Sequence, residues 1–157
     1  MAEKALLLFN SLSSLSTLRC LDLSKNKMPK LIALKMADSL PKLPRLQVLS
    51  LSNINLTDDV VEKFSDMLQD MHQLKKLNIS NNQGLSARSV KDIAACLKLI
   101  SALEDIDMSK LRCNTVDTFK ELAELIMSNK KLKSIGLQRV GMTDQLASYL
   151  TEPLVRA

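Results

Sequence analysis

Aromatic residues, glycine and proline are all scarce in this chain of 157 residues. Trp is absent, and only three Phe and one Tyr are present. Three Gly and four Pro are too few for a collagen-like, Gly/Ser-linker or Pro-rich disordered chain. Leucine, by contrast, occurs 31 times, which is roughly twice its ordinary frequency. The length suits one domain with a real core, and we expect that core to be aliphatic and built in repeated layers.

Charge of one sign and long apolar runs are also lacking. The 22 basic and 17 acidic residues give a formal net charge of +5, spread over stretches of mixed sign. Because a nucleic-acid groove combines one-signed charge with aromatic stacking partners, we expect no nucleic-acid partner. No apolar run reaches the roughly 18 residues that a membrane span needs, and the start of the chain lacks a signal-peptide cleavage pattern. We therefore expect no membrane association and a cytoplasmic location.

The residues that usually carry catalysis or bind metals are few. Cys20, Cys96 and Cys113 form an odd set without CxxC spacing, which does not fit a zinc site and indicates reduced thiols. The single histidine, His72, has no neighbouring motif of a nucleophilic device. Neither GxGxxG nor a P-loop motif is present. We expect no enzyme activity, no metal and no cofactor.

One apolar pattern, L-x-x-L-x-L, recurs five times. Its copies begin at Leu18, Leu46, Leu74, Leu103 and Leu132, so the starts are 28, 28, 29 and 29 residues apart. The period-two alternation within each copy predicts a short strand with one buried face. Apolar residues at helical spacing follow each copy. Thr57 is a candidate N-cap of the second such stretch, and the later stretches begin at about Ser86, at Thr115 and at Thr143.

The first helical stretch, around Leu31 to Leu40, is closed by Pro41 and Pro44, because proline does not fit inside a helix. Residues 1–17 are interpreted as the helix of a preceding partial repeat. A lone strand–helix unit cannot bury its apolar face, whereas stacked copies bury it against each other. The sequence therefore predicts a single α/β domain over residues 1–157 with about five repeats. We expect a right-handed arc, with short parallel strands on the concave face and helices on the convex face.

These copies resemble ribonuclease-inhibitor-like leucine-rich repeats, whose consensus is L-x-x-L-x-L-x-x-N/C-x-L followed by a helix. The segments 18–26 and 74–82 match the asparagine form and end in Asn26 and Asn82. The other three copies place Ile54, Leu111 and Val140 at this ninth position. They lack the amide that would bond the turning backbone, so we expect its polar groups to be satisfied in another way.

Similar repeats occur in ribonuclease inhibitor, the Ran GTPase-activating protein, the sensing arrays of NOD-like receptors and bacterial effectors. Repeat arrays normally carry polar terminal caps, and the sequence has no such segment at either end. We therefore interpret the chain as a segment of a larger intracellular protein, such as the C-terminal leucine-rich repeat array of an innate immune NOD-like receptor. A small free-standing array is the competing interpretation.

Function is expected on the surface between the leucines. The third and fifth residues of each copy face the concavity, and the eighth lies at the edge of the sheet. The resemblance implies a protein-interaction module that binds another protein, or neighbouring domains of the same chain. Open alternatives are a structural or autoinhibitory spacer, a bacterial effector and a GTPase-activating accessory. We expect the partner to be selected by polar side chains of the concave face, namely Asp22, Ser50, Lys76, Asn78, Asp105, Asp107, Lys110 and Arg139.

Overall fold

The computed structural model describes residues 2–156, so the outermost residues of the predicted domain, Met1 and Ala157, lie outside the described residues. Short strands alternate with helices along the chain, and the strands form one sheet in the order β1-β2-β3-β4-β5. All neighbouring strands are parallel. The strands are β1 (Cys20–Asp22), β2 (Val48–Ser50), β3 (Lys76–Asn78), β4 (Asp105–Asp107) and β5 (Ser134–Gly136).

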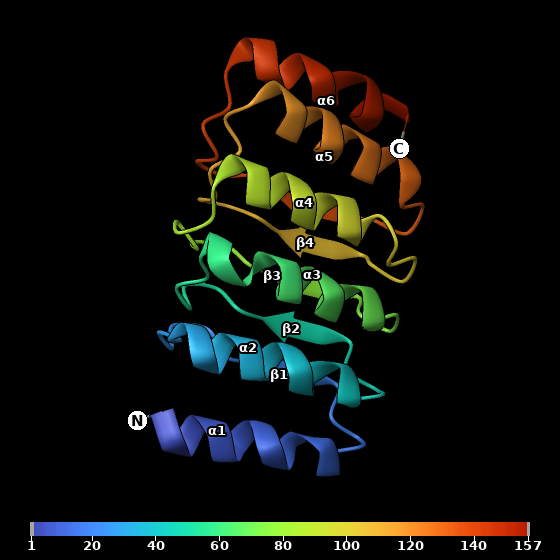
Figure 1. Cartoon of the computed structure of the whole chain (residues 1–157). Coiled ribbons are helices and arrows are strands. Elements are labelled where there is room, and N and C mark those ends of the chain that lie inside the picture. The colour runs from blue at the N-terminus through green and yellow to red at the C-terminus, as the bar shows by residue number, and fades with distance from the viewer. Residues whose placement is uncertain (1, 157) are drawn as a thin grey trace.

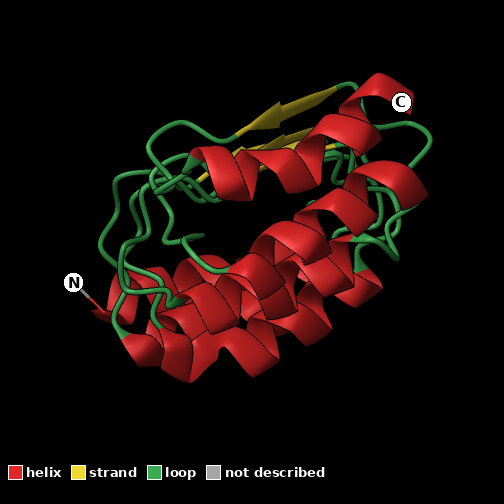
Figure 2. Cartoon of the chain, turned by 90° about the horizontal axis from the view of Figure 1, so that it is seen from above, coloured by secondary structure: helices red, strands yellow, loops and turns green. Residues whose placement is uncertain are grey.

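The helices form a second layer in which each helix packs against the next (Figure 1). Short 3-10 turns precede or follow some of them, at η1 (Leu12–Ser14), η2 (Leu40–Lys42) and η3 (Asp58–Val60). Seen from above, the strands lie together on one side of the molecule and most of the helices on the other (Figure 2). The helices are α1 (Ala2–Ser11), α2 (Lys30–Ser39), α3 (Val61–Asp70), α4 (Ala87–Leu97), α5 (Val116–Ser128) and α6 (Asp144–Arg156).

The strand register follows the sequence period. Leu21, Leu49, Leu77, Ile106 and Ile135 are successive partners across the sheet, one from each repeat. Neighbouring strands lie about 4.8 Å apart, whereas packed helices need about 8–10 Å between their axes. The stack therefore curves with the strands inside, and the predicted α/β solenoid of five leucine-rich repeats is confirmed.

The core is one continuous cluster of mainly aliphatic side chains that runs from Phe9 of α1 to Leu150 of α6. Phe64 and Phe119, on α3 and α5, are its largest fully buried members. The remaining bulk comes from leucine, isoleucine, valine and methionine, which accounts for a core of this size with so few aromatic residues. None of the described helices combines the length and the apolar composition that crossing a bilayer requires.

Three of the four predicted helix starts are confirmed. The hydroxyl of Ser86 accepts the N–H of Ser89 at the start of α4, and that of Thr115 accepts the N–H of Thr118 at the start of α5, both at 3.3 Å. Thr143 caps α6 in the same way. Each of these side chains satisfies a backbone donor that has no partner within its own helix.

The prediction that Thr57 caps the second full helix is wrong. The turn η3 comes between Thr57 and α3, which begins only at Val61. The hydroxyl of Thr57 instead donates to the carboxylate of Asp59. The sequence predicts that Pro41 lies beyond the end of a helix, but it lies inside the 3-10 turn η2. Proline is accepted there because it is near the start of the turn.

The amide of Asn82 is fully buried and satisfies backbone groups of two repeats. Its Oδ1 accepts the N–H groups of Ile54 and Leu56 at 3.1 and 3.0 Å. Its Nδ2 donates to the carbonyls of Leu51 and Ile79 at 2.9 and 2.8 Å. The second repeat has isoleucine at the ninth position, and the asparagine of the third repeat bonds its buried backbone groups instead. This meets the expectation that buried backbone polar groups find hydrogen-bond partners.

Candidate functional site

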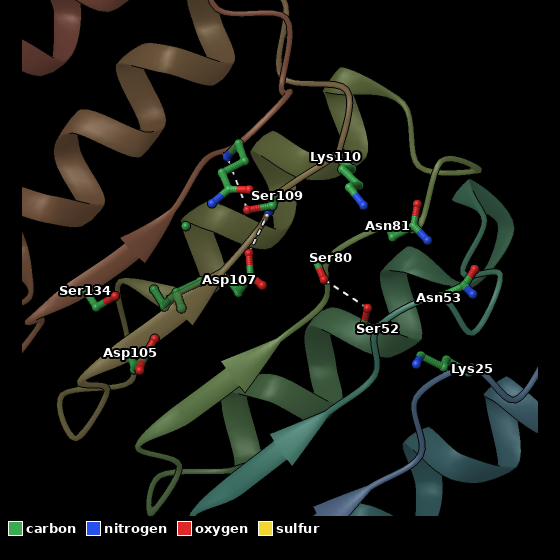
Figure 3. A pocket seen from close by; sticks show the side chains of 13 residues that line it. Lys25, Ser52, Asn53, Ser80, Asn81, Asp105, Asp107, Ser109, Lys110 and Ser134 are labelled. Carbon is green, nitrogen blue, oxygen red and sulfur yellow. Dashed lines mark hydrogen bonds between the residues drawn. The ribbon is translucent and has the colours of Figure 1, made fainter.

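A shallow hollow of about 490 Å³ lies on the strand side of the molecule, where β2 to β5 run into their loops (Figure 3). Ser52, Ser80 and Ser109 contribute hydroxyl groups to it, and Asp105 and Asp107 contribute carboxylates. Eleven of its thirteen lining residues have polar or charged side chains, in contrast to the aliphatic core behind the strands. Several repeats present hydrogen-bonding groups together at this surface.

Serine occupies the seventh position of four repeats, and these hydroxyls bond along the stack. The hydroxyls of Ser52 and Ser80 lie 2.9 Å apart. Ser24 bonds the hydroxyl of Ser50 at 2.7 Å, and Ser109 accepts the backbone N–H of Gln138 at 3.1 Å. Much of the hydrogen-bonding capacity of these serines is thus used inside the protein, where it joins the first repeat to the second, the second to the third and the fourth to the fifth.

The fifth position carries a second internal role that the sequence analysis did not foresee. Oδ1 of Asp22, Asn78 and Asp107 each accepts the backbone N–H of the serine two residues later, at 2.8, 2.9 and 3.0 Å respectively. Hydrogen bonds from Ser24 hold the pKa of Asp22 below its usual value. These three side chains therefore close the turn after their strands, and the second oxygen or the amide nitrogen remains for a partner.

Two of the predicted binding residues pair with each other. Lys76 and Asp105 are direct partners in the register of β3 and β4, and Lys76 Nζ lies 3.6 Å from Asp105 Oδ2. Both side chains are exposed, by 57% and 40%. An exposed pair of this kind contributes little to stability, about 0–1 kcal/mol, so both charges remain available to a partner.

Gly136 leaves the space in which the carboxylate of Asp107 lies. The two residues are partners across β4 and β5. A Cβ at position 136 would lie 2.5 Å from Oδ1 of Asp107 and 3.2 Å from the hydroxyl of Ser109. Without a side chain at Gly136, the hollow stays open at this end.

Five residues at the eighth position form a row along the edge of the sheet, which we call the edge row. All five have left-handed backbone, with φ between 56° and 64°. The backbone N–H of each of the first four donates to a carbonyl of the next repeat, which extends the ladder of the sheet beyond the strands. The edge row consists of Lys25, Asn53, Asn81, Lys110 and Arg139.

The structure divides the predicted binding residues into two groups. Asp105, Asp107 and Lys110 line the hollow together. Five others lie on neighbouring parts of the strands or of their edge: Asp22, Ser50, Lys76, Asn78 and Arg139. The prediction omitted members of the edge row and the serines of the hollow. Asparagine at the eighth position, a residue that tolerates positive φ, and serine recurring at the seventh were the available signals.

The remaining candidates for chemistry are dispersed. Cys20 and His72 are exposed, and Cys96 is half-buried. Cys113 is buried, and desolvation raises the pKa of its thiol to about 12. Among residues 6–12 and 14–151, whose side chains the structure describes, no three His, Cys, Asp or Glu side chains lie close enough together to hold a metal ion.

The fold and its hollow define a leucine-rich-repeat-like α/β solenoid with a polar concave face. No family model and no curated protein matches the chain. Among solved structures, the tropomodulin C-terminal domain of Caenorhabditis elegans is similar, with a TM-score of 0.80, 14% identity, and coverage of 97% of this chain and 92% of that one. Actin-binding site 2 of leiomodin-1 is similar too, with a TM-score of 0.77, 17% identity, and coverage of 94% and 86%.

At these identities the likeness shows the fold alone. It also corrects the assignment made from the repeats. The interpretation as a ribonuclease-inhibitor-like array from a NOD-like receptor is wrong, because solved structures that share this fold over nearly the whole chain include tropomodulin and leiomodin domains, which are not NOD-like receptor arrays. The consensus could not reveal this, since its leucines report the buried face that all such repeats share.

Proposed function

We propose that this chain is a non-enzymatic protein-binding module that takes its partner on the concave face of the sheet, with actin as the first candidate. The observation that carries the proposal is the polar hollow of about 490 Å³, which lies on the sheet face opposite the layer of packed helices. A surface of this kind binds by charge and hydrogen-bond complementarity.

The choice of actin rests on the structural likeness. Leiomodin-1 contains a domain described as an actin-binding site, and that domain shares its fold with 94% of the present chain. Fold by itself does not define function. Actin is therefore the partner to test first. The charged residues of the concave face are the ones to substitute in that test.

The ion pair between Lys76 and Asp105 gives a way to reverse the local pattern of charge on this face without changing its net charge or losing the pair. In the variant K76D/D105K the two charges exchange strands and can still pair across β3 and β4. The helical face offers a matched control. Lys63 of α3 and Asp38 of α2 form an exposed pair at 2.9 Å, so K63D/D38K makes the same exchange on the other side of the protein.

The test is the affinity of the full chain for purified actin, measured by titration. K76D/D105K should weaken binding at least about tenfold, which corresponds to ~1.4 kcal/mol, whereas K63D/D38K should change it by less than about twofold. Equal losses in both variants, or a loss confined to the helical swap, would overturn the concave face as the binding surface. No binding by the parent chain would remove actin as its partner.

A further inference from the structure

The edge row combines cations and amides and carries no carboxylate. Lys25, Lys110 and Arg139 are positively charged, and Asn53 and Asn81 lie between the first two. We propose that the edge row binds an extended acidic segment of the partner, with carboxylates four residues apart held by Lys25 and Lys110. This inference rests on the proposed binding through the concave face and names the chemistry of the segment bound there.

The backbone of the edge row favours residues other than lysine and arginine. Positive φ costs an ordinary L-residue roughly 1–2 kcal/mol, and glycine and asparagine are the residues that adopt it readily. Asn53 and Asn81, at φ 56° and 57°, fit this requirement. Lys25 and Lys110 adopt the same conformation, at φ 64° and 61°. The fold alone therefore does not account for their charge, which points to a use outside the fold.

These cations are available to a partner. Lys25, Lys110 and Arg139 are exposed, and within the described part of the chain none of them lies within 4.0 Å of a carboxylate oxygen. Three carboxylates lie near them. Asp22 is near enough for the charge of Lys25 to help lower its pKa, and Asp105 and Asp107 line the same hollow as Lys25 and Lys110.

Each of those carboxylates has one oxygen engaged elsewhere, because Oδ1 of Asp22 and of Asp107 accepts the N–H of a serine in its own turn and Oδ2 of Asp105 lies 3.6 Å from Lys76 Nζ. The backbone N–H groups of Lys25 and Lys110 are engaged too, at 2.8 and 2.7 Å from carbonyls of the next repeat. Recognition at the edge row must therefore come from the side chains. Lysine and arginine donors form their strongest hydrogen bonds with anionic oxygens.

The spacing of the row selects an extended segment. Neighbouring strands lie about 4.8 Å apart, so Lys25 and Lys110, three repeats apart, are separated by about 14 Å along the edge. Residues i and i+4 of an extended chain lie on the same face and are about 13 Å apart. The amides of Asn53 and Asn81 can bond the main chain between these two carboxylates. Arg139 lies one repeat beyond Lys110 and can take a further carboxylate.

The probe is a fluorescent peptide of glycine and serine with two glutamates at positions i and i+4. A peptide of the same composition with glutamates at i and i+3, which lie on opposite faces when extended, is its control. A third peptide carries glutamine in place of both glutamates. The parent chain should bind the first peptide about tenfold more tightly than either of the others at low ionic strength.

The protein variants use asparagine, which suits the backbone of the edge row. K25N/K110N should bind the first peptide about tenfold more weakly and melt at or above the temperature of the parent. K130N/K131N removes two exposed lysines from the loop between α5 and β5 and should change peptide binding less than about twofold. N81K, which adds a cation at the same backbone conformation, should tighten binding about threefold.

The outcomes separate this inference from the proposed function. If K25N/K110N binds peptide and actin as well as the parent while K76D/D105K weakens actin binding, the acidic-segment proposal fails and the concave face stands. If peptide binding falls as expected but the parent does not bind actin, the inference stands and actin is the wrong partner. A lower melting temperature for K25N/K110N would show that these lysines serve the fold, which contradicts the proposal.

Discussion

Asn82 supplies a hydrogen bond that the equivalent residue of the preceding repeat, Ile54, cannot make with its own side chain. Oδ1 of Asn82 accepts the backbone N–H of Ile54 at 3.1 Å, and both residues are fully buried. One amide therefore serves the turns of two repeats. The consequence is that stability at this point belongs to the contact between repeats, as expected for a solenoid.

Asn82→Ala is expected to be among the most destabilising single changes in the chain. It would leave the N–H groups of Ile54 and Leu56 buried without an acceptor, at about 1–3 kcal/mol for each such group. We predict a loss of about 3–5 kcal/mol in the free energy of unfolding, measured by urea denaturation.

Asn26→Ala is the matched control for that measurement. Asn26 occupies the same position of the first repeat but is exposed, and its amide donates to the carbonyls of Leu23 and Ser24 at 3.1 and 3.2 Å. Its loss should cost less than about 1 kcal/mol. Equal costs for the two variants would show that the shared amide is not what joins the second and third repeats.

Asp58 forms a second contact between repeats, from the turn η3 to the start of α4. Its Oδ1 accepts the N–H of Ser86 at 2.7 Å and the hydroxyl of Ser89 at 2.6 Å. Desolvation raises the pKa of Asp58, but the hydrogen bonds from Ser89 and Ser86 outweigh it and leave the pKa below its ordinary value. A carboxylate at a helix N-terminus also interacts favourably with the helix dipole.

The contribution of Asp58 to the free energy of unfolding should therefore decrease in acid. Because its folded pKa lies below the unfolded value, the contribution is complete above the unfolded pKa and is lost as pH falls through the folded pKa. Asp58→Asn should lower stability near pH 7 and differ less from the parent in strong acid, in urea denaturation at a series of pH values. Ser89→Ala, which removes one donor, should show part of the same change. A difference that stays constant with pH would exclude the charged contact.

The three cysteines should react in an order set by burial. Cys20 is exposed, Cys96 is half-buried, and Cys113 is buried with its pKa raised to about 12. Since the thiolate is the reactive form, a maleimide at pH 7.5 should label Cys20 first and leave Cys113 unlabelled until the chain unfolds. Mass spectrometry of the labelled protein would measure this. Rapid labelling of Cys113 in the native protein would contradict the packing of the fourth repeat.

The fold could be predicted from the sequence because the apolar residues that specify it recur at a regular interval. Leucines at a spacing of 28 or 29 residues specify the strands, their partners and the buried face, and every strand register follows from that spacing. The failure of Thr57 to cap a helix could not be predicted, because the turn η3 comes between Thr57 and α3, and the Thr57 hydroxyl donates to Asp59 within that turn. Local capping rules do not include such competition.

The candidate site was predictable only in outline. Position within the repeat placed Asp105 and Asp107 on the concave strands and Lys110 at the edge of the sheet, and the structure brings all three to the hollow. Their role in binding stays a prediction. Position within the repeat did not show that Asp107 also closes its own turn, or that Lys110 has left-handed backbone. Those features depend on main-chain geometry, which the leucine pattern does not contain. The sequence says least about the partner, because the residues that repeat are buried in the core and are not available for binding.

The most direct test of the concave face is lysine footprinting of the intact chain with and without actin, read by mass spectrometry. Exposed lysines occur on both sides of the protein, so one experiment measures the lysine reactivity of each face. We predict that Lys25, Lys76 and Lys110 lose reactivity on binding, while Lys63 of α3 and Lys130, in the loop before β5, keep theirs. Protection of Lys63 and Lys130 with unchanged reactivity at the other three would contradict the account.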